Sequence, residues 1–192
     1  MDGLLALSRA IDRLTDWLGR WVAWLVVAAI LVSAGNAVIR KLFDSSSNAW
    51  LELQWWMFGA VFLLAAPWTL RVNEHIRIDI VSSRFTPRTR TLVDIVGHAL
   101  FLVPLTLVVI VTSWPFFVRS FALNEQSANA GGLPSWPAKF LIPLAFALLL
   151  AQGLSELVKR IAALRGIGDP PPAPPHHPAI DMHAAPPTAE KR

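Results

Sequence analysis

The chain has 192 residues, of which 54% are hydrophobic and only 16% are charged, and its mean hydropathy is +0.49. This apolar content is too high for an ordinary soluble domain and predicts an all-α integral membrane protein. The formal charge of +4 does not indicate nucleic-acid binding, because the arginines stand at the ends of apolar runs, where they orient membrane helices. The sequence has no Cys, which excludes disulfides and thiolate metal sites.

Residues 1–20 form an amphipathic lead-in, because apolar residues recur at three- and four-residue spacing among arginines and aspartates. The first predicted span covers residues 21–39. We expect it to be retained, since no convincing small-residue cleavage site follows the apolar run. Ala29, Ser33 and Ala37 are spaced by four and predict a small face that packs closely against another helix.

The second predicted span covers residues 50–70, and its uncharged run of about 18 residues is long enough to cross a bilayer core. It begins with Glu52, Gln54 and Trp55. Glu52 is either an ion ligand or the partner of Arg40 or Lys41, and its shallow depth favours the ion pair. Trp55 and its neighbouring tryptophans are interface anchors or part of a protein-facing patch.

A basic connection follows, with five arginines between residues 71 and 90. Two acids lie among them and predict local ion pairs, Arg77 with Asp79 or Arg71 with Glu74. With His75, this segment is expected to form a structural clamp rather than an ion site. Its alternating isoleucines fit a short strand or a surface helix equally well. The Thr86-Pro87 pair predicts the start of the next helix.

The third and fourth spans are predicted at residues 92–113 and 137–158. Pro104 should kink the third span and Pro115 should help to end it, leaving a loop at residues 116–136. Ser135 is placed to cap the fourth span, and Gly166 to stop it. A second small face is predicted on this span, and its members are Ala147, Ala151 and Ser155. Residues 166–192 form a tail rich in proline and alanine that should be disordered.

Counting basic residues predicts the orientation. Eleven Lys and Arg residues flank the N-terminus, the second connection and the C-terminal end of span four, against four on the other side. The positive-inside rule then places both termini in the cytoplasm and the third connection outside.

The sequence contains no recognisable catalytic set, no metalloprotease or nucleophile motif and no glycine-rich phosphate loop, so we expect neither an enzyme nor a bound cofactor. His98 with Glu156 is the best available metal pair, and it is too small a ligand set. His98 and Gln152 lie at similar depth in spans three and four. An interhelical hydrogen bond between them is favoured over a role in proton or ion transfer.

The motifs resemble a known family. The order Asn73-Glu74-His75-Ile76-Arg77-Ile78-Asp79, after a span that begins Glu52-Leu53-Gln54, is similar to the small membrane subunit (DctQ family) of tripartite ATP-independent periplasmic (TRAP) transporters. The outer-loop stretch with Gly132, Pro134 and Trp136 resembles the second hallmark of that family, and Gln152-Gly153-x-x-Glu156 resembles its closing motif. The resemblance covers about residues 10–165 and excludes the tail.

This resemblance implies a bacterial inner-membrane subunit with partners. The expected partners are a large multi-span permease subunit, which carries the substrate and sodium sites, and an extracytoplasmic solute-binding protein, which delivers an organic acid. Membrane lipids are a further expected partner. The small subunit would act as a scaffold and docking surface, with no substrate site of its own.

The alternative is a self-contained four-span carrier or channel. Such a protein needs an acid deep in a span. Glu52, Asp94 and Glu156 are all expected near a membrane surface, which favours the subunit.

Overall fold

The computed structural model describes residues 2–43, 47–72 and 86–167. In these ranges the chain is helical except for short connections, of which the loop at 123–135 is the longest. The helices in chain order are α1 (Asp2–Phe43), α2 (Asn48–Arg71), α4 (Pro87–Gly97), the π-helical segment η1 (His98–Leu102), α5 (Val103–Ala122) and α6 (Trp136–Leu164). The ranges contain no strand, only an isolated β-bridge between Gln126 and Pro134.

Four helical stretches in the described part of the chain are long and apolar enough to cross a membrane. Their bounds are Gly3–Phe43, Asn48–Arg71, Arg88–Ala122 and Trp136–Leu164. The predicted fold class, an all-α protein with four transmembrane helices, is therefore confirmed. The lead-in and the first span are one helix of 42 residues, about 63 Å long at 1.5 Å per residue. This is about twice a bilayer core, so a large part of α1 extends beyond the core.

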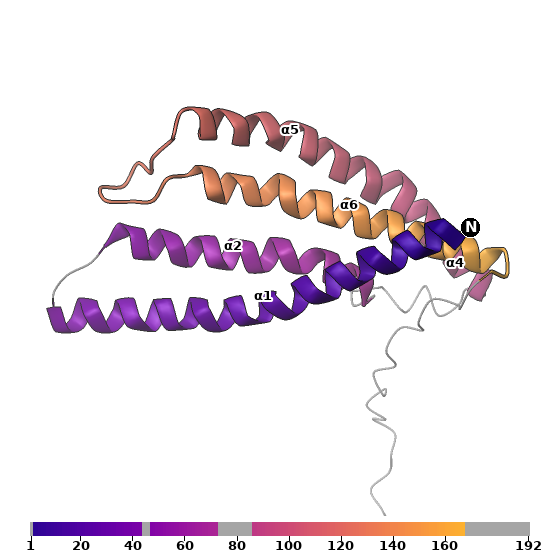
Figure 1. Cartoon of the computed structure of the whole chain (residues 1–192), viewed down its shortest axis with the longest axis horizontal. Coiled ribbons are helices and arrows are strands. Elements are labelled where there is room, and N and C mark those ends of the chain that lie inside the picture. Colours follow the sequence, from indigo (N-terminus) through magenta and orange to yellow (C-terminus); the bar gives the residue numbers. More distant parts are fainter. Residues whose placement is uncertain (1, 44–46, 73–85, 168–192) are drawn as a thin grey trace, which may run out of the picture.

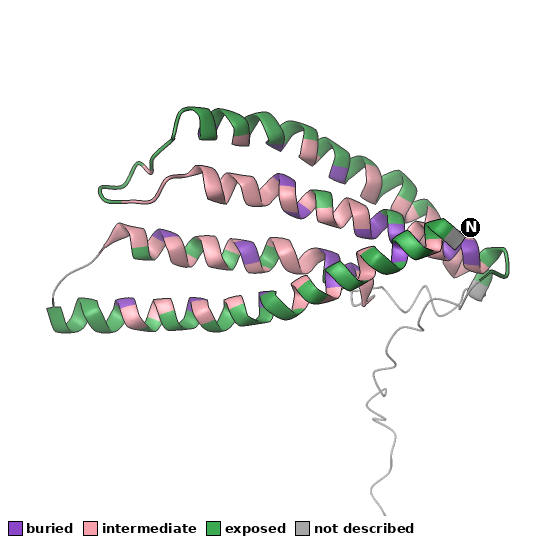
Figure 2. Cartoon of the chain, viewed as in Figure 1, coloured by how far each residue is buried: buried purple, intermediate pink, exposed green. Residues whose placement is uncertain are grey.

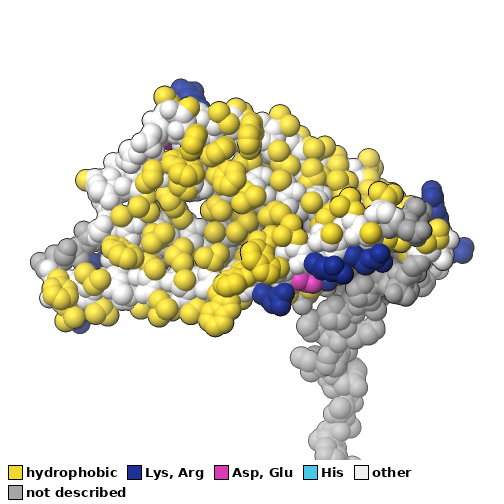
Figure 3. All heavy atoms as spheres, in the orientation of Figure 1, with side chains coloured by type: hydrophobic (Ala, Val, Ile, Leu, Met, Phe, Trp, Pro, Cys, Tyr) yellow, Lys and Arg dark blue, Asp and Glu magenta, His cyan; other side chains and the backbone are white. Residues whose placement is uncertain are grey.

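The helices form an open layer rather than a closed four-helix bundle (Figure 1). α6 is the central helix: it packs against α5 on one side and against α1 and α2 on the other. Among the described helices, α5 has no substantial contact with α1 or α2. Burial is concentrated on α6 and where α1 crosses it, whereas α5 is mostly exposed (Figure 2). Hydrophobic side chains cover most of the face in Figure 3, as expected for helices surrounded by lipid or by another subunit.

The buried face of α1 repeats every seven residues. Its members are Ser8, Thr15, Val22, Ala29 and Asn36, each less than a tenth exposed. A seven-residue repeat corresponds to 3.5 residues per turn, which keeps one stripe against neighbouring helices along a supercoil. Small and short polar residues on this stripe let the helices approach closely.

The two small faces predicted from four-residue spacing are correct only in part. On α1, Ala29 is fully buried, Ser33 is half-buried and Ala37 is exposed. On α6, Ser155 is buried, Ala151 is half-buried and Ala147 is exposed. A spacing of four advances the side chain around the helix by about 40° per step, so each predicted row turns away from the interface.

The third span differs from its predicted form at both prolines. The disturbance at Pro104 is the π-helical segment η1, which ends just before it. Because proline has no N–H and clashes with the carbonyl one turn earlier, a π-turn is a common way to adjust the bonding there. The prediction that Pro115 helps to end the helix is wrong, since α5 continues past it to Ala122. The loop is therefore shorter than the predicted 116–136.

Three helix ends test the predicted signals. Thr86 is confirmed as an N-cap, because its hydroxyl accepts a bond from the Thr89 N–H at 3.3 Å. Ser135 occupies the N-cap position of α6 but makes no side-chain capping bond, so that part of the prediction is wrong. Gly166 has a φ of +71° directly after α6, as a glycine stop requires. The tail predicted as disordered lies outside the described residues from residue 168 onward.

Candidate functional site

Glu52 holds the loop between α5 and α6. Its carboxylate is buried in the first turns of α2 and accepts hydrogen bonds from three loop groups. The Ser127 hydroxyl donates to Oε1, the Asn129 amide donates to Oε1 at 2.8 Å, and the Leu133 backbone N–H donates to Oε2 at 2.7 Å. The predicted pairing of Glu52 with Arg40 or Lys41 is therefore wrong: neutral donors from a distant part of the chain satisfy the carboxylate. We call this arrangement, Glu52 with loop 123–135, the clasp.

The clasp requires glycine at two positions. Gly131 has a φ of +70°, which side-chain-bearing residues rarely adopt. At Gly132, an added Cβ would lie 2.5 Å from the Ser127 Cβ and 2.7 Å from the Glu52 Oε1. Gly132 thus lies against the carboxylate because it has no side chain. The predicted loop residue Gly132 and the predicted span residue Glu52 belong to one site.

The rest of the loop is tied to the helix ends. The Asn48 amide donates to the Ala130 carbonyl at 2.9 Å, and the Ser135 N–H donates to the Glu125 carbonyl at 2.8 Å. The Lys139 ammonium, which pairs with the Glu125 carboxylate, holds the pKa of that carboxyl below its usual value of 4.5. The loop is therefore a built surface rather than a loose connection.

The aromatic part of the loop end is also fixed. Trp136 packs edge-on against Phe121, with ring centroids 5.2 Å apart. Pro134 pairs with Gln126 in the isolated bridge. The predicted interface residue Pro134 therefore belongs to the clasp, and Trp136 follows directly after it.

A second polar site lies at the opposite end of the layer and is centred on Gln152. This fully buried side chain of α6 accepts a bond from the Thr15 hydroxyl at 2.8 Å. It donates to Asp12 Oδ1 at 2.9 Å and to Glu156 Oε1 at 3.2 Å. Ser155, one turn away, donates to the same Asp12 oxygen at 3.2 Å. One face of α6 is thus bonded to α1 by polar contacts.

Ion pairs extend this site to the other helices. Lys159 contacts Asp12 at 3.1 Å, Arg71 of α2 pairs with Asp16 of α1, and Arg160 pairs with Asp94 of α4. We call the whole set the ionic network, and its members are Asp12, Thr15, Asp16, Arg71, Asp94, Gln152, Ser155, Glu156, Lys159 and Arg160. It joins α1, α2, α4 and α6 at one point. Arg160 and Glu156 are buried, whereas Arg71, Asp16, Asp94 and Lys159 are partly exposed.

The predicted hydrogen bond between His98 and Gln152 does not form. The His98 Nδ1 lies 2.6 Å from the Asp94 carbonyl of its own helix, and its buried Nε2 has no hydrogen-bond partner. Gln152 faces α1 instead, because the Thr15 hydroxyl and the Asp12 carboxylate bond to it there. The pair was predicted from equal depth, which does not determine the direction in which a side chain points around its helix.

Other predicted residues lie outside these two sites. Gln54 is half-buried, and the Trp55 side chain is 68% exposed on α2. His75, Arg77 and Asp79 fall within residues 73–85, which are not described, and the predicted pairing of Arg71 with Glu74 extends into the same segment. The described residues contain no group of three or more side chains that could hold a metal ion.

Sequence reasoning missed most of the partners. Ser127 and Asn129 were not identified, and neither were Asp12, Lys159 and Arg160 as members of a network. One signal was available: the acids at positions 12 and 16 are separated by about one helical turn, so they lie near each other on the helix surface. Paired polar residues on one face of a membrane helix indicate a partner helix.

The fold and the two sites define a class of protein: a polytopic helical membrane protein whose polar side chains join its own helices and loop. Residues 29–163 match the family described as tripartite ATP-independent periplasmic transporters, DctQ component. The match covers more than half of the chain, which therefore belongs to this family and is a small component of a TRAP transporter. No curated protein matches the chain.

Proposed function

We propose that this chain is the small permease subunit of a TRAP-type secondary transporter. It scaffolds a large permease subunit and helps to dock an extracytoplasmic binding protein. One observation carries this proposal: each of the six acidic side chains that the structure describes is engaged by bases or donors of this chain. A carrier needs an available acid or polar cavity in its spans. A scaffold needs fixed geometry, which the network and the clasp supply.

The positions of the two sites suggest that the ionic network serves scaffolding and the clasp serves docking. The ionic network sets the arrangement of four helices, and thereby the shape of the apolar faces offered to the large subunit. The clasp presents an ordered polar loop at the other end, where a soluble partner can reach it. We propose that this end faces outward, that both termini are cytoplasmic, and that the segment with His75, Arg77 and Asp79 clamps the inner surface.

The transport reaction is proposed to be sodium-coupled uptake of an organic acid across the bacterial inner membrane. This part follows from the family resemblance. The substrate and ion sites would lie in the large subunit.

Reconstitution tests the proposal. Liposomes are prepared with this chain alone, with the large subunit alone, and with both, and uptake of a labelled organic acid is followed under a sodium gradient with binding protein present. We expect uptake only when both subunits are present. Uptake by this chain alone would support a self-contained carrier and overturn the proposal.

A matched pair of variants separates docking from scaffolding. Glu52→Gln should loosen the clasp, because an amide presents a donor to groups that are themselves donors. The variant should still co-purify with the large subunit, but uptake should need more binding protein for half-maximal rate. Gln54→Ala, in the same turn, should behave as the original protein. If Glu52→Gln leaves the binding-protein concentration for half-maximal uptake unchanged, the clasp has no part in docking.

A further inference from the structure

The charged residues of the first half of α1 differ in their partners. Asp12 and Asp16 contact Lys159 and Arg71 in the ionic network. Arg9, Arg13 and Arg20 are exposed, and none forms an ion pair with a described residue. Their spacing of four and seven puts them on one side of the helix, opposite the buried stripe. Figure 3 shows basic side chains gathered over this part of α1, with an acidic side chain among them and hydrophobic surface beside them.

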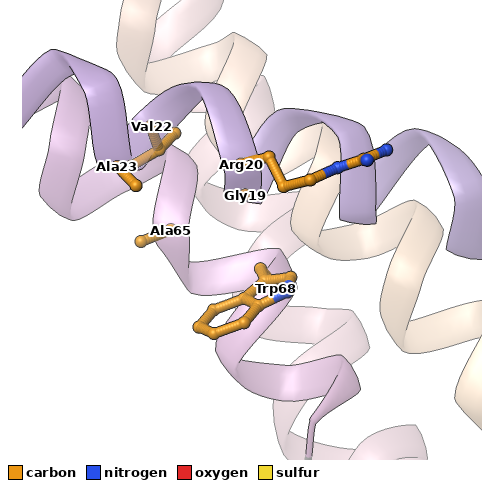
Figure 4. A pocket seen from close by; sticks show the side chains of 6 residues that line it. All are labelled: Gly19, Arg20, Val22, Ala23, Ala65 and Trp68. Carbon is orange, nitrogen blue, oxygen red and sulfur yellow. The ribbon is translucent and has the colours of Figure 1, made fainter.

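A groove between α1 and α2 starts at the last of these arginines. Its volume is about 330 Å³, and its lining is almost entirely apolar. The residues that line it are Gly19, Arg20, Val22, Ala23, Ala65 and Trp68 (Figure 4). Trp68 lies across Gly19 so closely that a Cβ there would be 2.6 Å from its ring. The missing side chain of Gly19 thus allows the indole to form one wall.

The groove has a charged end and an apolar end. α1 and α2 run in opposite directions, so Ala23 and Ala65 both lie deeper in the layer than Arg20 and Trp68. In Figure 4, the Arg20 side chain extends away from Val22 and Ala23, and Ala65 lies on their side of Trp68. Arg20 also marks the point where the apolar run of α1 begins. A tryptophan and an arginine at such a boundary are typical of the membrane interface.

We propose that this groove binds one anionic phospholipid, with its phosphate on Arg20 and an acyl chain along Ala23 and Ala65. The guanidinium can make two parallel hydrogen bonds to a phosphate, and Arg9 and Arg13 add positive potential on the same face. The apolar floor excludes a free phosphate as the sole ligand, because it would leave the floor empty. Asp12 and Asp16, the acids nearest to these arginines on α1, are already paired with Lys159 and Arg71, so this face keeps an excess of positive charge that favours an anionic over a zwitterionic headgroup.

Native mass spectrometry of the full chain, released from mild detergent, tests this inference. The chain is titrated with phosphatidylglycerol, with phosphatidylcholine of the same acyl chains, and with glycerol phosphate. We expect one tightly retained phosphatidylglycerol per chain, weaker retention of phosphatidylcholine, and no retention of glycerol phosphate. Equal retention of the two lipids, or binding of glycerol phosphate alone, would overturn the proposal.

Matched variants locate the site. Arg20→Gln should weaken retention of phosphatidylglycerol about fivefold, and Arg20→Lys should weaken it less, because the charge is kept. Arg9→Gln removes an exposed arginine of the same face about 16 Å away along the helix, and it should have a smaller effect. If Arg9→Gln has the same effect as Arg20→Gln, binding is diffuse and there is no site.

A second pair of variants tests the groove without changing any charged residue. Ala23→Leu should fill the floor and reduce retention, whereas Ala34→Leu, at another exposed alanine of α1, should not. Circular dichroism confirms that each variant keeps its helical content. Equal retention by the folded Ala23→Leu variant would show that the acyl chain does not lie in this groove.

Discussion

At the scale of single residues, Glu52 decides how the loop end is built. A carboxylate near the start of a membrane helix has to be satisfied, and here three donors of loop 123–135 satisfy it. Because the donors are dispersed over the loop, bonding them to one side chain fixes the whole segment. Gly132 makes this possible by leaving the space that a side chain would fill.

We predict that Gly132→Ala opens the clasp, because its Cβ would clash with Ser127 and with the Glu52 carboxylate. Limited proteolysis in detergent should cleave the loop several times faster than in the original protein. Gly59→Ala is the control, since a Cβ there meets nothing within 4 Å. Unchanged cleavage of the Gly132→Ala loop would mean that Glu52 does not hold it.

We also predict a pH dependence at Glu125. Its pKa is lowered chiefly by the hydrogen bond from Lys139, so the ion pair is present at neutral pH and is lost as the pH falls through the lowered value, below 4.5. A carboxyl-carbon NMR titration should give a midpoint below 4.5, and Lys139→Gln should raise it. A midpoint at or above 4.5 in the original protein would contradict the contact.

At the scale of helices, the seven-residue stripe of α1 and the ionic network fix how the elements meet. Ala29 is a member of the stripe and is fully buried, while Ala37 of the predicted small face is exposed. The network then holds the N-terminal half of α1 across α6. Together they set both the register and the crossing of α1.

We predict that Ala29→Leu destabilises the chain by about 1–3 kcal/mol, because extra methylenes have no space at a close helix contact. Ala37→Leu should have little effect on stability. Thermal unfolding of the purified variants measures the difference. Equal stability of both variants would show that the stripe faces lipid.

For the network, we predict that Arg160→Gln lowers the free energy of unfolding by about 1–3 kcal/mol, since it removes a buried guanidinium that pairs with the partly exposed Asp94 and lies near Glu156. Arg165→Gln, at an exposed position just beyond α6, is the control and should change stability little. If both substitutions change stability by a similar small amount, the network does not hold the helices together.

At the scale of the whole molecule, the layer is open and exposes apolar side chains on its faces. The central position of α6 and the weakly covered α5 leave large surfaces for lipid or for the other components of the transporter. The two polar sites at opposite ends keep the layer in one shape. The proposed scaffold role requires such a shape before the partners bind.

The orientation of this layer is a prediction from the basic residues alone. Reporter fusions after residues 45 and 125 should both report the outer side. The physical reason is the excess of Lys and Arg at the opposite end, eleven against four. A cytoplasmic signal at either position would reverse the assignment of the clasp to the outer surface.

The sequence alone determined the class of protein, the number of spans, several helix ends and the family. These features depend on local properties of the sequence: the length of apolar runs, the positions of proline and glycine, and short motifs. Local properties are informative for membrane helices because each helix must satisfy its own backbone hydrogen bonds. Thr86 and Gly166 are examples, since the local conformation that each favours agrees with the observed helix end.

Only the tertiary structure decided which side chains meet. Glu52 was expected to pair with Arg40 or Lys41 of the preceding span, but its partners lie about 75 to 81 residues away. Gln152 was expected to bond to His98, but it bonds to Asp12 and Thr15 of α1. The direction of a side chain around a helix depends on the rotation and crossing of that helix, and these are set by packing over the whole layer. That packing also brought the acids of α1 to bases of α2 and α6 and left its arginines exposed.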